Sequence, residues 1–288
     1  MQLLRVDIPS FKPYRVMPIG DIQWDGKDGA TALHLLQQSI QVGLERGAHF
    51  VGMGDYIDPF SPSNRQRLEG AALYDTARGV IDNQGVQLVE ELYEEALAPT
   101  RNRWLGLLEG HHFMQLREGD TTDQRLCKLL NAPHLGTCAF IGLRFSRHGG
   151  KVGYVVLWVH HGAGSGQRAS APATKLETIT PYWEADVFIM GHMTKQAAVP
   201  INRVYPVWHG TPHLSHRKKL LVGSGGFSKG YIEYAKQGQT PRGSYVEQKM
   251  LNPAALGCPL ITIIPHIRNE RLNGVRTEIW EPQITVEV

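Results

Sequence analysis

The first half of the chain alternates short apolar runs with segments of helical periodicity. The apolar runs stop abruptly at Gly or another turn former, which predicts buried strands over residues 14–19, 50–53 and 103–109. The segments between and after them repeat apolar residues at helical spacing, which predicts helices over residues 31–46, 71–97 and 123–130. The stretch 61–67, which carries Pro, Ser and Arg, is predicted to be a loop.

The second half of the chain consists mostly of strand-like runs. These cover residues 152–159, 185–190, 203–208, 219–222, 260–265 and 276–288. A half that alternates strands and helices, followed by a strand-rich half, indicates an α/β sandwich with a pair of mixed sheets and helices outside. The chain shows no repeat of fixed period and no low-complexity linker, so a single domain over residues 1–288 is expected.

Composition narrows the class of protein without naming a function. Hydrophobic residues make up 42% and charged residues 20% of the 288 positions, so a packed core is expected rather than disorder. The chain has no apolar run of the ~18 residues that a membrane span needs, and its start lacks a signal-peptide pattern. The three cysteines are scattered, which favours a reducing, cytoplasmic location. A net charge of +3 permits an anionic substrate but does not require nucleic acid.

Five predicted strand ends terminate in Asp or His next to Gly. They are Asp21, Asp55, His111–His112, His160–His161 and His192. A single buried histidine is usually a hydrogen-bonded polar group and no more. Five such ends in succession indicate a shared site at the edge of a sheet, where α/β proteins bind their ligands. Carboxylates and imidazoles together are typical ligands of divalent transition metals.

In order and spacing, these blocks resemble the calcineurin-like metallophosphoesterase family. The likeness is carried by residues 21–23, 54–58, 110–113, 160–162 and 191–194, with a softer likeness of residues 223–231 to phage and bacterial members. The resemblance implies a four-layer α/β/β/α sandwich with two mixed β-sheets. It places the motif core at 14–230 and uses the C-terminal strands of 231–288 to complete the sheets. It also implies a metal-dependent hydrolase of phosphate esters.

The resemblance further implies one or two divalent ions. Mn is favoured, and Fe, Zn, Mg and Ni are the alternatives. The implied ligands are Asp21, Gln23, Asp55, His111, His160, His161 and His192. Asp55 would be shared between two ions, which lie ~3.5–4 Å apart in two-metal sites. Successive strand residues face opposite sides, so only one of His160 and His161 is expected to point into the site, and likeness to the family favours His160.

Three positions depart from the family pattern. Gln23 and Thr194 stand where the pattern has His, and His111 stands where it has Asn. One ion position is therefore weakened, because a hydroxyl is a poor ligand for transition metals, and the other is enriched in imidazole. Two unequal metals, one metal and a catalytically impaired protein remain open.

The resemblance gives His112 the role of the catalytic histidine, which stabilises the phosphoryl group or protonates the leaving alkoxide. Asp58 would fix the tautomer of His112. The alternatives are that His112 is a further metal ligand and that Asp58 caps the turn before Pro59. Candidate substrate-binding residues are Arg65, Arg117, Arg168 and Thr194. Arginine suits bidentate phosphate recognition, although most charged residues are solvated surface groups.

The favoured function is a phosphodiesterase or nuclease that acts in the cytoplasm, or in the host cytoplasm if a phage encodes it. A phosphate ester is the expected partner, with DNA or RNA as candidates and no membrane. The alternatives are a phosphomonoesterase and a catalytically impaired protein that binds a phosphorylated ligand or nucleic acid. The basic stretch 213–219 could bind along a nucleic-acid backbone. The favoured interpretation is that its charges protect an edge strand from pairing with other chains.

Overall fold

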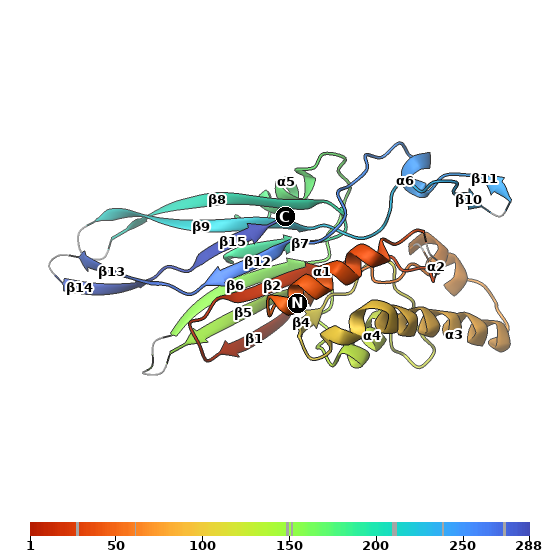
Figure 1. Ribbon diagram of the computed structural model, residues 1–288, viewed down its shortest axis with the longest axis horizontal. Helices are drawn as coiled ribbons and strands as arrows, with labels where there is room; N and C mark the ends of the chain where they lie inside the picture. The colour runs from red at the N-terminus through yellow and green to blue at the C-terminus, as the bar shows by residue number, and fades with distance from the viewer. Residues whose placement is uncertain are drawn as a thin grey trace.

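Two large sheets dominate the structure, a computed structural model that describes residues 1–26, 29–60, 62–147, 150, 152–208, 212–237, 239–272 and 275–288 (Figure 1). The six-stranded sheet has the order β1 (Gln2–Ile8), β5 (Cys138–Ser146), β6 (Val152–His160), β7 (Val187–Met190), β9 (His213–Ser224), β8 (Gln196–Val207). The five-stranded sheet has the order β15 (Gln283–Glu287), β12 (Leu260–Ile264), β2 (Tyr14–Ile19), β3 (His49–Gly52), β4 (Trp104–Leu107). Both sheets mix parallel and antiparallel pairs.

The described helices are α1 (Leu33–Glu45), α2 (Pro62–Glu69), α3 (Asp75–Leu92), α4 (Thr122–Leu130), α5 (Ala171–Glu177) and α6 (Tyr245–Gln248). A π-helical turn, Tyr93–Leu97, and a short 3-10 turn, Ala98–Thr100, follow α3. Two small ribbons complete the described chain. They are β10 (Lys236–Gln237) with β11 (Thr240–Pro241), and β13 (Ile267–Leu272) with β14 (Val275–Trp280). None of the described helices is both long and apolar enough to cross a membrane.

The main core lies between the two sheets. Alternate residues of β2 and β3, such as Val16 and Val51, pack in one cluster with Ile141 of β5, Leu157 of β6 and Ile189 of β7. Because strand side chains alternate between faces, the other faces of both sheets need cover. The chain is therefore an α/β sandwich of two mixed sheets.

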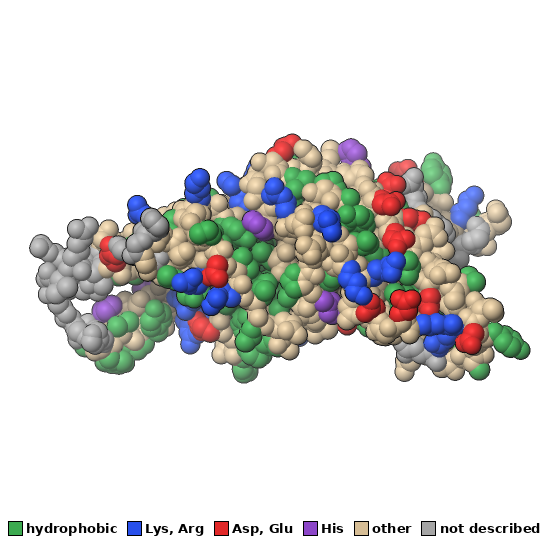
Figure 2. All heavy atoms as spheres, turned by 90° about the horizontal axis from the view of Figure 1, so that it is seen from below, with side chains coloured by type: hydrophobic (Ala, Val, Ile, Leu, Met, Phe, Trp, Pro, Cys, Tyr) green, Lys and Arg blue, Asp and Glu red, His purple; other side chains and the backbone are tan. Residues whose placement is uncertain are grey.

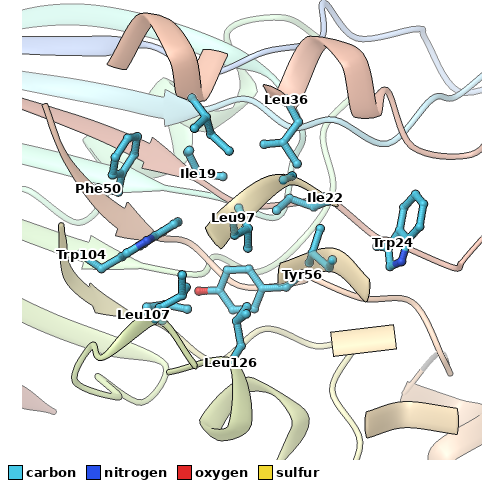
Figure 3. Packing of buried hydrophobic residues seen from close by; sticks show 14 of the residues in the cluster. Ile19, Ile22, Trp24, Leu36, Phe50, Tyr56, Leu97, Trp104, Leu107 and Leu126 are labelled. Atoms are coloured by element: carbon cyan, nitrogen blue, oxygen red, sulfur yellow. The ribbon is translucent and has the colours of Figure 1, made fainter. Parts of the chain in front are cut away.

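Helices cover the outer faces. Leu36 of α1, Leu88 of α3 and Leu126 of α4 pack with Phe50 and Tyr56 against the five-stranded sheet. Figure 3 shows the Tyr56 ring among these apolar side chains, and its hydroxyl donates to the carbonyl oxygen of Leu108 at 2.8 Å. Helix α5 covers part of the other sheet through a separate cluster that contains Leu176, Trp158 and Phe188. The loops that leave β2 and β3 are thus anchored to the packed core.

Two expectations about local structure are wrong. The predicted loop 61–67 is largely helical, because α2 occupies Pro62–Glu69, with Ser61 outside the described residues. Its proline stands at the helix start, where no backbone N–H is needed, and good helix formers follow. The single strand expected over residues 276–288 is two strands, β14 and β15, which belong to different sheets.

The sequence prediction also missed two strands of the larger sheet. Strand β5 alternates buried and half-buried residues along its whole length, so the period-two signal was present in the sequence. Strand β1 is an edge strand, with only Ile8 buried, and its pattern is correspondingly weak. The helix α5 was likewise not predicted, since it spans only seven residues.

Candidate metal centre

The turns that follow β2 and β3 lie side by side and carry the first two candidate ligands. The backbone N–H of Asp21 donates to the carbonyl oxygen of Gly54 at 2.9 Å, and that of Gln23 donates to Asp55 at 3.0 Å. These hydrogen bonds extend the parallel pairing of β2 and β3 into the loops. Asp21 and Asp55 are therefore brought to one sheet edge, as their strand-end positions predicted.

Glycines allow the neighbouring turns to approach this edge closely. A methyl group added at Gly110 would overlap the nitrogen and Oδ1 of Asp55. One added at Gly54, which has a φ of +92°, would lie 2.5 Å from Nδ1 of His161. Any side chain at these two positions would push the turns apart, so the glycines beside the candidate ligands are a packing requirement of the site.

Four side chains meet at this edge with one ligand atom each, all within 4.8 Å of one another. They are Asp55, His111, His161 and His192, here called the imidazole corner. The Nδ1 atoms of His111 and His192 lie 3.2 Å apart, and Nε2 of His161 lies 3.4 Å from Oδ2 of Asp55. Asp55 is 2% and His161 1% exposed. Such a carboxylate and imidazole set could hold a divalent transition metal ion.

Hydrogen bonds orient two of the rings so that one nitrogen faces the cluster. Nδ1 of His161 lies 2.6 Å from the carbonyl oxygen of Met53, and Nε2 of His192 lies 3.0 Å from that of Gly164. A carbonyl oxygen only accepts, so these two nitrogens are the donors. Nε2 of His161 and Nδ1 of His192 are then the atoms directed into the corner. Histidines that bind metals are usually held in this way by their other nitrogen.

The protonation equilibria of the corner are strongly shifted. Burial, together with the nearby rings of His161 and His192, lowers the pKa of His111 to about 4. Burial also lowers the pKa of His192. Burial opposes charge on His161, but the hydrogen bond and the charge of Asp55 raise the pKa of His161 to about 9. Binding of a cation between Asp55 and His161 would therefore release a proton.

A second group of candidate ligands, here called the Asp21 corner, consists of Asp21, Gln23 and Thr194. Asp21 is fully buried, and its Oδ2 accepts a hydrogen bond from the backbone N–H of His192 at 2.8 Å. A methyl group at Gly226 would lie 2.8 Å from Cβ of Asp21 and 3.4 Å from Cβ of Thr194, so both side chains flank this glycine. Burial and the charge of Asp55 raise the pKa of Asp21 to about 7.

Two buried atoms test whether these residues suit a metal ion. Oδ1 of Asp21 is buried and forms no hydrogen bond with the described residues, and Nε2 of the buried His161 faces the carboxylate of Asp55 at a long 3.4 Å. Buried polar atoms are nearly always satisfied, and an unobserved ion is one accepted reason for an exception. Both atoms belong to the proposed ligand set, so the residues present fit a divalent cation.

The backbone at these positions is unusual as well. Among the described residues, nine that are not glycine have a positive φ, and five of them are Asp21, Gln23, Asp55, His192 and Thr194. Such conformations cost on the order of 1–3 kcal/mol each and gather at functional sites. Thr194 is the most unfavourable case, because its β-branched side chain strongly disfavours this region. The fold therefore holds these five residues of the candidate site in an unfavourable backbone conformation.

His112 and Asp58 form a pair next to the imidazole corner. Nδ1 of His112 lies 2.6 Å from Oδ1 of Asp58, and the backbone N–H groups of His111 and His112 both donate to Oδ1 of Asp55. Burial alone would lower the pKa of His112, but the hydrogen bond to Asp58 and the charge of Asp55 raise it overall. The ring of His112 is thus held against an acceptor and tied to a candidate ligand through the backbone.

His161, and not His160, enters the cluster, contrary to the preference based on likeness to the family. Nδ1 of His160 accepts the backbone N–H of Gly162 at 2.7 Å, and the ring stacks on Trp158 with centroids 5.5 Å apart. His160 is the last residue of β6 and faces the α5 side with Trp158. The next residue therefore turns toward the sandwich core and the cluster.

The predicted substrate-binding arginines differ in their partners, and Arg65 is the one with hydrogen bonds to a turn of the site among the described residues. Nη1 of Arg65 donates to the carbonyl oxygens of His111 and Phe113 at 2.8 and 2.7 Å, and its guanidinium lies 4.0 Å from the centroid of the Phe113 ring. Arg117 is exposed and pairs with Asp82 at 3.6 Å. Arg168 is exposed in the loop before α5. Arg65 therefore supports the turn that carries His111 and His112.

A buried carboxyl that the sequence reasoning missed supports the same turn. Asp123 lies in the first turn of α4, and its Oδ2 accepts the backbone N–H of Gly110 at 3.1 Å. Burial is the main reason that the pKa of Asp123 is raised to about 7. In the sequence, the capping box of Thr121 and Gln124 marks the start of α4. It places Asp123 in the first turn of that helix.

Comparison with models of known protein families gave no match to this chain. No curated protein matched it either.

Proposed function

We propose that this protein is a metal-dependent hydrolase of phosphate esters, similar to calcineurin-like metallophosphoesterases, and that it prefers phosphodiesters to monoesters. The observation that carries the proposal is the convergence of Asp55, His111, His161 and His192 within 4.8 Å, beside the His112–Asp58 pair. The fold supports it, because the ends of four strands, β3, β4, β6 and β7, supply these residues to one edge of a two-sheet sandwich.

The imidazole corner would hold one divalent ion, and Asp21 with the shared Asp55 and the amide of Gln23 would hold a weaker second one. Such ions neutralise the phosphate oxygens and lower the pKa of a bound water toward neutrality. Mn is the favoured ion by likeness to the family; the carboxylates suit Mn, and the imidazoles also suit Fe or Zn. Oδ1 of Asp21, which forms no hydrogen bond with the described residues, and Nε2 of His161, which faces Asp55, are among the atoms expected to bind.

His112 would act on the leaving oxygen. Asp58 accepts a hydrogen bond from the N–H at Nδ1 of His112, so Nε2 is the atom that delivers a proton to the departing alkoxide. The backbone N–H of His112 is bonded to Oδ1 of Asp55 at 2.9 Å, which keeps this acid at a constant distance from the ligand set. A correctly placed general acid contributes ~10²–10⁴-fold to the rate.

Elemental analysis and turnover of bis(4-nitrophenyl) phosphate test the proposal together. We expect bound Mn, Fe or Zn and turnover that falls ~10²–10⁴-fold in His112→Ala. The matched control is His134→Ala, which removes an imidazole that pairs with Glu109 at 3.7 Å and lies outside both corners. Metal-loaded protein without turnover, or equal losses in both variants, would contradict the proposal.

The Asp21 corner favours a second candidate, a catalytically impaired relative that binds a phosphorylated ligand or nucleic acid. Gln23 and Thr194 stand where the family pattern places imidazoles, and both keep the positive φ of a ligand position. Metal-free protein that binds DNA without cleaving it would support this candidate. The same elemental analysis and turnover assay therefore separates the two functions.

A further inference from the structure

A cavity of about 240 Å³ lies between α2, α3 and the segment that follows His112. Its apolar lining consists of Phe60, Leu68, Ile81, Met114 and Leu116. Its charged lining consists of Arg65, Arg78, Arg117 and Asp82. Figure 1 shows α2 and α3 at the end of the molecule away from the β13–β14 ribbon. None of the residues assigned above to metal binding or proton transfer lines this cavity.

The cavity wall is connected to the site by hydrogen bonds and by the chain itself. Arg65, on its wall, donates to the carbonyl oxygens of His111 and Phe113, the residues on either side of His112. Phe60 follows Asp58 by two residues, a separation that spans at most about 7 Å. The walls of the cavity are therefore built from the same two segments that hold the His112–Asp58 pair.

Charge and shape restrict what the cavity can bind. Three guanidinium groups and one carboxylate line it, so its lining is net positive. Asp82 pairs with Arg117 at 3.6 Å, whereas Arg78 forms no ion pair with a described residue. Met114 and Leu116 are 3% and 7% exposed and form an apolar floor. The volume is slightly below the ~300–1,000 Å³ of typical ligand pockets, which suits one compact ring or short chain.

The outer surface near α3 does not offer a similar combination. Figure 2 shows Lys and Arg mixed with Asp and Glu over this end of the face seen from below. Mixed surface charge is screened and gives little preference for an anion. The cavity, by contrast, combines apolar area with a positive lining, which matches an anionic molecule that carries an apolar group.

We propose that this cavity binds the organic group on the leaving-oxygen side of a small phosphodiester, a compact aromatic or aliphatic group, while Arg78 attracts the negative charge of the substrate. The inference rests on the proposed function, because His112 is the group assigned to the leaving oxygen. It makes the substrate a small phosphodiester with a compact aromatic or aliphatic group, because that group must fit a cavity of about 240 Å³.

Calorimetric binding of two inert phosphodiesters to the metal-loaded protein tests the cavity without requiring turnover. Dibenzyl phosphate should bind about tenfold or more tightly than dimethyl phosphate, since burial of a ring of this size is favourable. Ile81→Trp and Leu68→Trp fill the cavity from α3 and α2 and should each abolish this preference. Val80→Trp makes the same change one residue away, at a side chain that is 70% exposed, and should retain it.

Binding of inorganic phosphate should be unchanged in all three variants, because phosphate alone does not reach the cavity. Thermal unfolding shows whether Ile81→Trp or Leu68→Trp has lost its fold. If one of them has, the binding preference is judged from the other. Equal binding of the two esters by the wild type, or a preference retained in a folded filling variant, would overturn the inference. A preference without turnover of bis(4-nitrophenyl) phosphate would reject the proposed reaction and leave the cavity assigned. Turnover without a preference for dibenzyl phosphate would support the proposed reaction and reject the assignment of the cavity.

Discussion

The imidazole corner and the Asp21 corner occupy the same sheet edge but differ in their side chains. Both include strand-end residues with a positive φ, which in the imidazole corner are Asp55 and His192, and both contain a buried carboxylate. The imidazole corner has three histidines that converge with Asp55 within 4.8 Å. The Asp21 corner offers a carboxylate, an amide and a hydroxyl. The comparison teaches that the fold preserves the backbone of a ligand position even where the side chain is a weak ligand.

Unequal affinity follows from this difference. Imidazole and carboxylate bind transition metals well, whereas a neutral amide oxygen and a hydroxyl bind them poorly. Asp55 is the expected bridge between the two corners, and its Oδ1 already accepts two backbone N–H groups. The imidazole corner should therefore fill first, and the Asp21 corner should depend on it.

Replacement of Asp55 should have the largest effect, because both corners lose a ligand. Asp55→Ala also leaves the N–H groups of His111 and His112 without their acceptor. We expect metal content and kcat/KM to fall by more than the ~10–100-fold typical of residues that only support a ligand. Asp55→Asn, which keeps an acceptor oxygen, separates the structural loss from the loss of charge. Stoichiometric metal retained in Asp55→Ala would show that the corners do not share this residue.

The adjacent pair His160 and His161 gives the sharpest test of the imidazole corner. His161→Ala should lower metal affinity by about 100-fold or more, because it removes a ligand. His160→Ala should change affinity by only a few-fold, because its ring faces Trp158. Metal titration of both variants measures the difference. The assignment of His161 fails if the two variants lose metal equally.

Asp123 supports the imidazole corner from behind. Asp123→Ala should lower metal affinity and turnover about 10–100-fold, because Gly110 loses the acceptor that holds the turn before His111. Asp123→Asn should retain most of both, since an amide oxygen can still accept the Gly110 N–H. Metal titration and kcat/KM provide the readout. Similar values for the Ala variant and the wild type would remove Asp123 from this role.

The smallest expected change is a gain at the Asp21 corner. Thr194→His supplies the imidazole that the family pattern has, and we expect about tenfold tighter binding of a second ion. Thr194→Asn is the control, because Asn tolerates the left-handed backbone better than Thr but adds no imidazole. Elemental analysis of the metal-to-protein ratio measures the outcome. A ratio that is unchanged in Thr194→His would show that Thr194 does not define this corner.

The sequence predicted the parts of the fold that have strong local signals. The buried strands β2, β3, β4, β6 and β7 appeared as short apolar runs, and α1 and α4 as periodic segments. The weak edge strand β1 and the short helix α5 were missed, because their stability comes from tertiary packing rather than from their own pattern. Helix α2 was taken for a loop since its first residues are typical of loops.

The candidate site also has residues that the sequence predicts and residues whose roles only the structure shows. The sequence predicts as ligands, because residues at the ends of strands gather at one edge of a sheet, Asp21, Gln23, Asp55, His111, His192 and one of His160 and His161. The roles of His161 and Asp123 depend on how the chain turns after β6 and how α4 packs against Gly110. No local pattern encodes these contacts, because they join residues far apart in the sequence.

The sequence by itself determined which residues reach the edge of the sheets, since hydrophobic periodicity sets the strands and the glycines set their ends. Only the tertiary structure decided which side chains meet there. The direction in which a side chain points at the end of a strand depends on a single backbone turn. That turn directs the ring of His161, and not that of His160, into the cluster, and it is set by packing between distant segments.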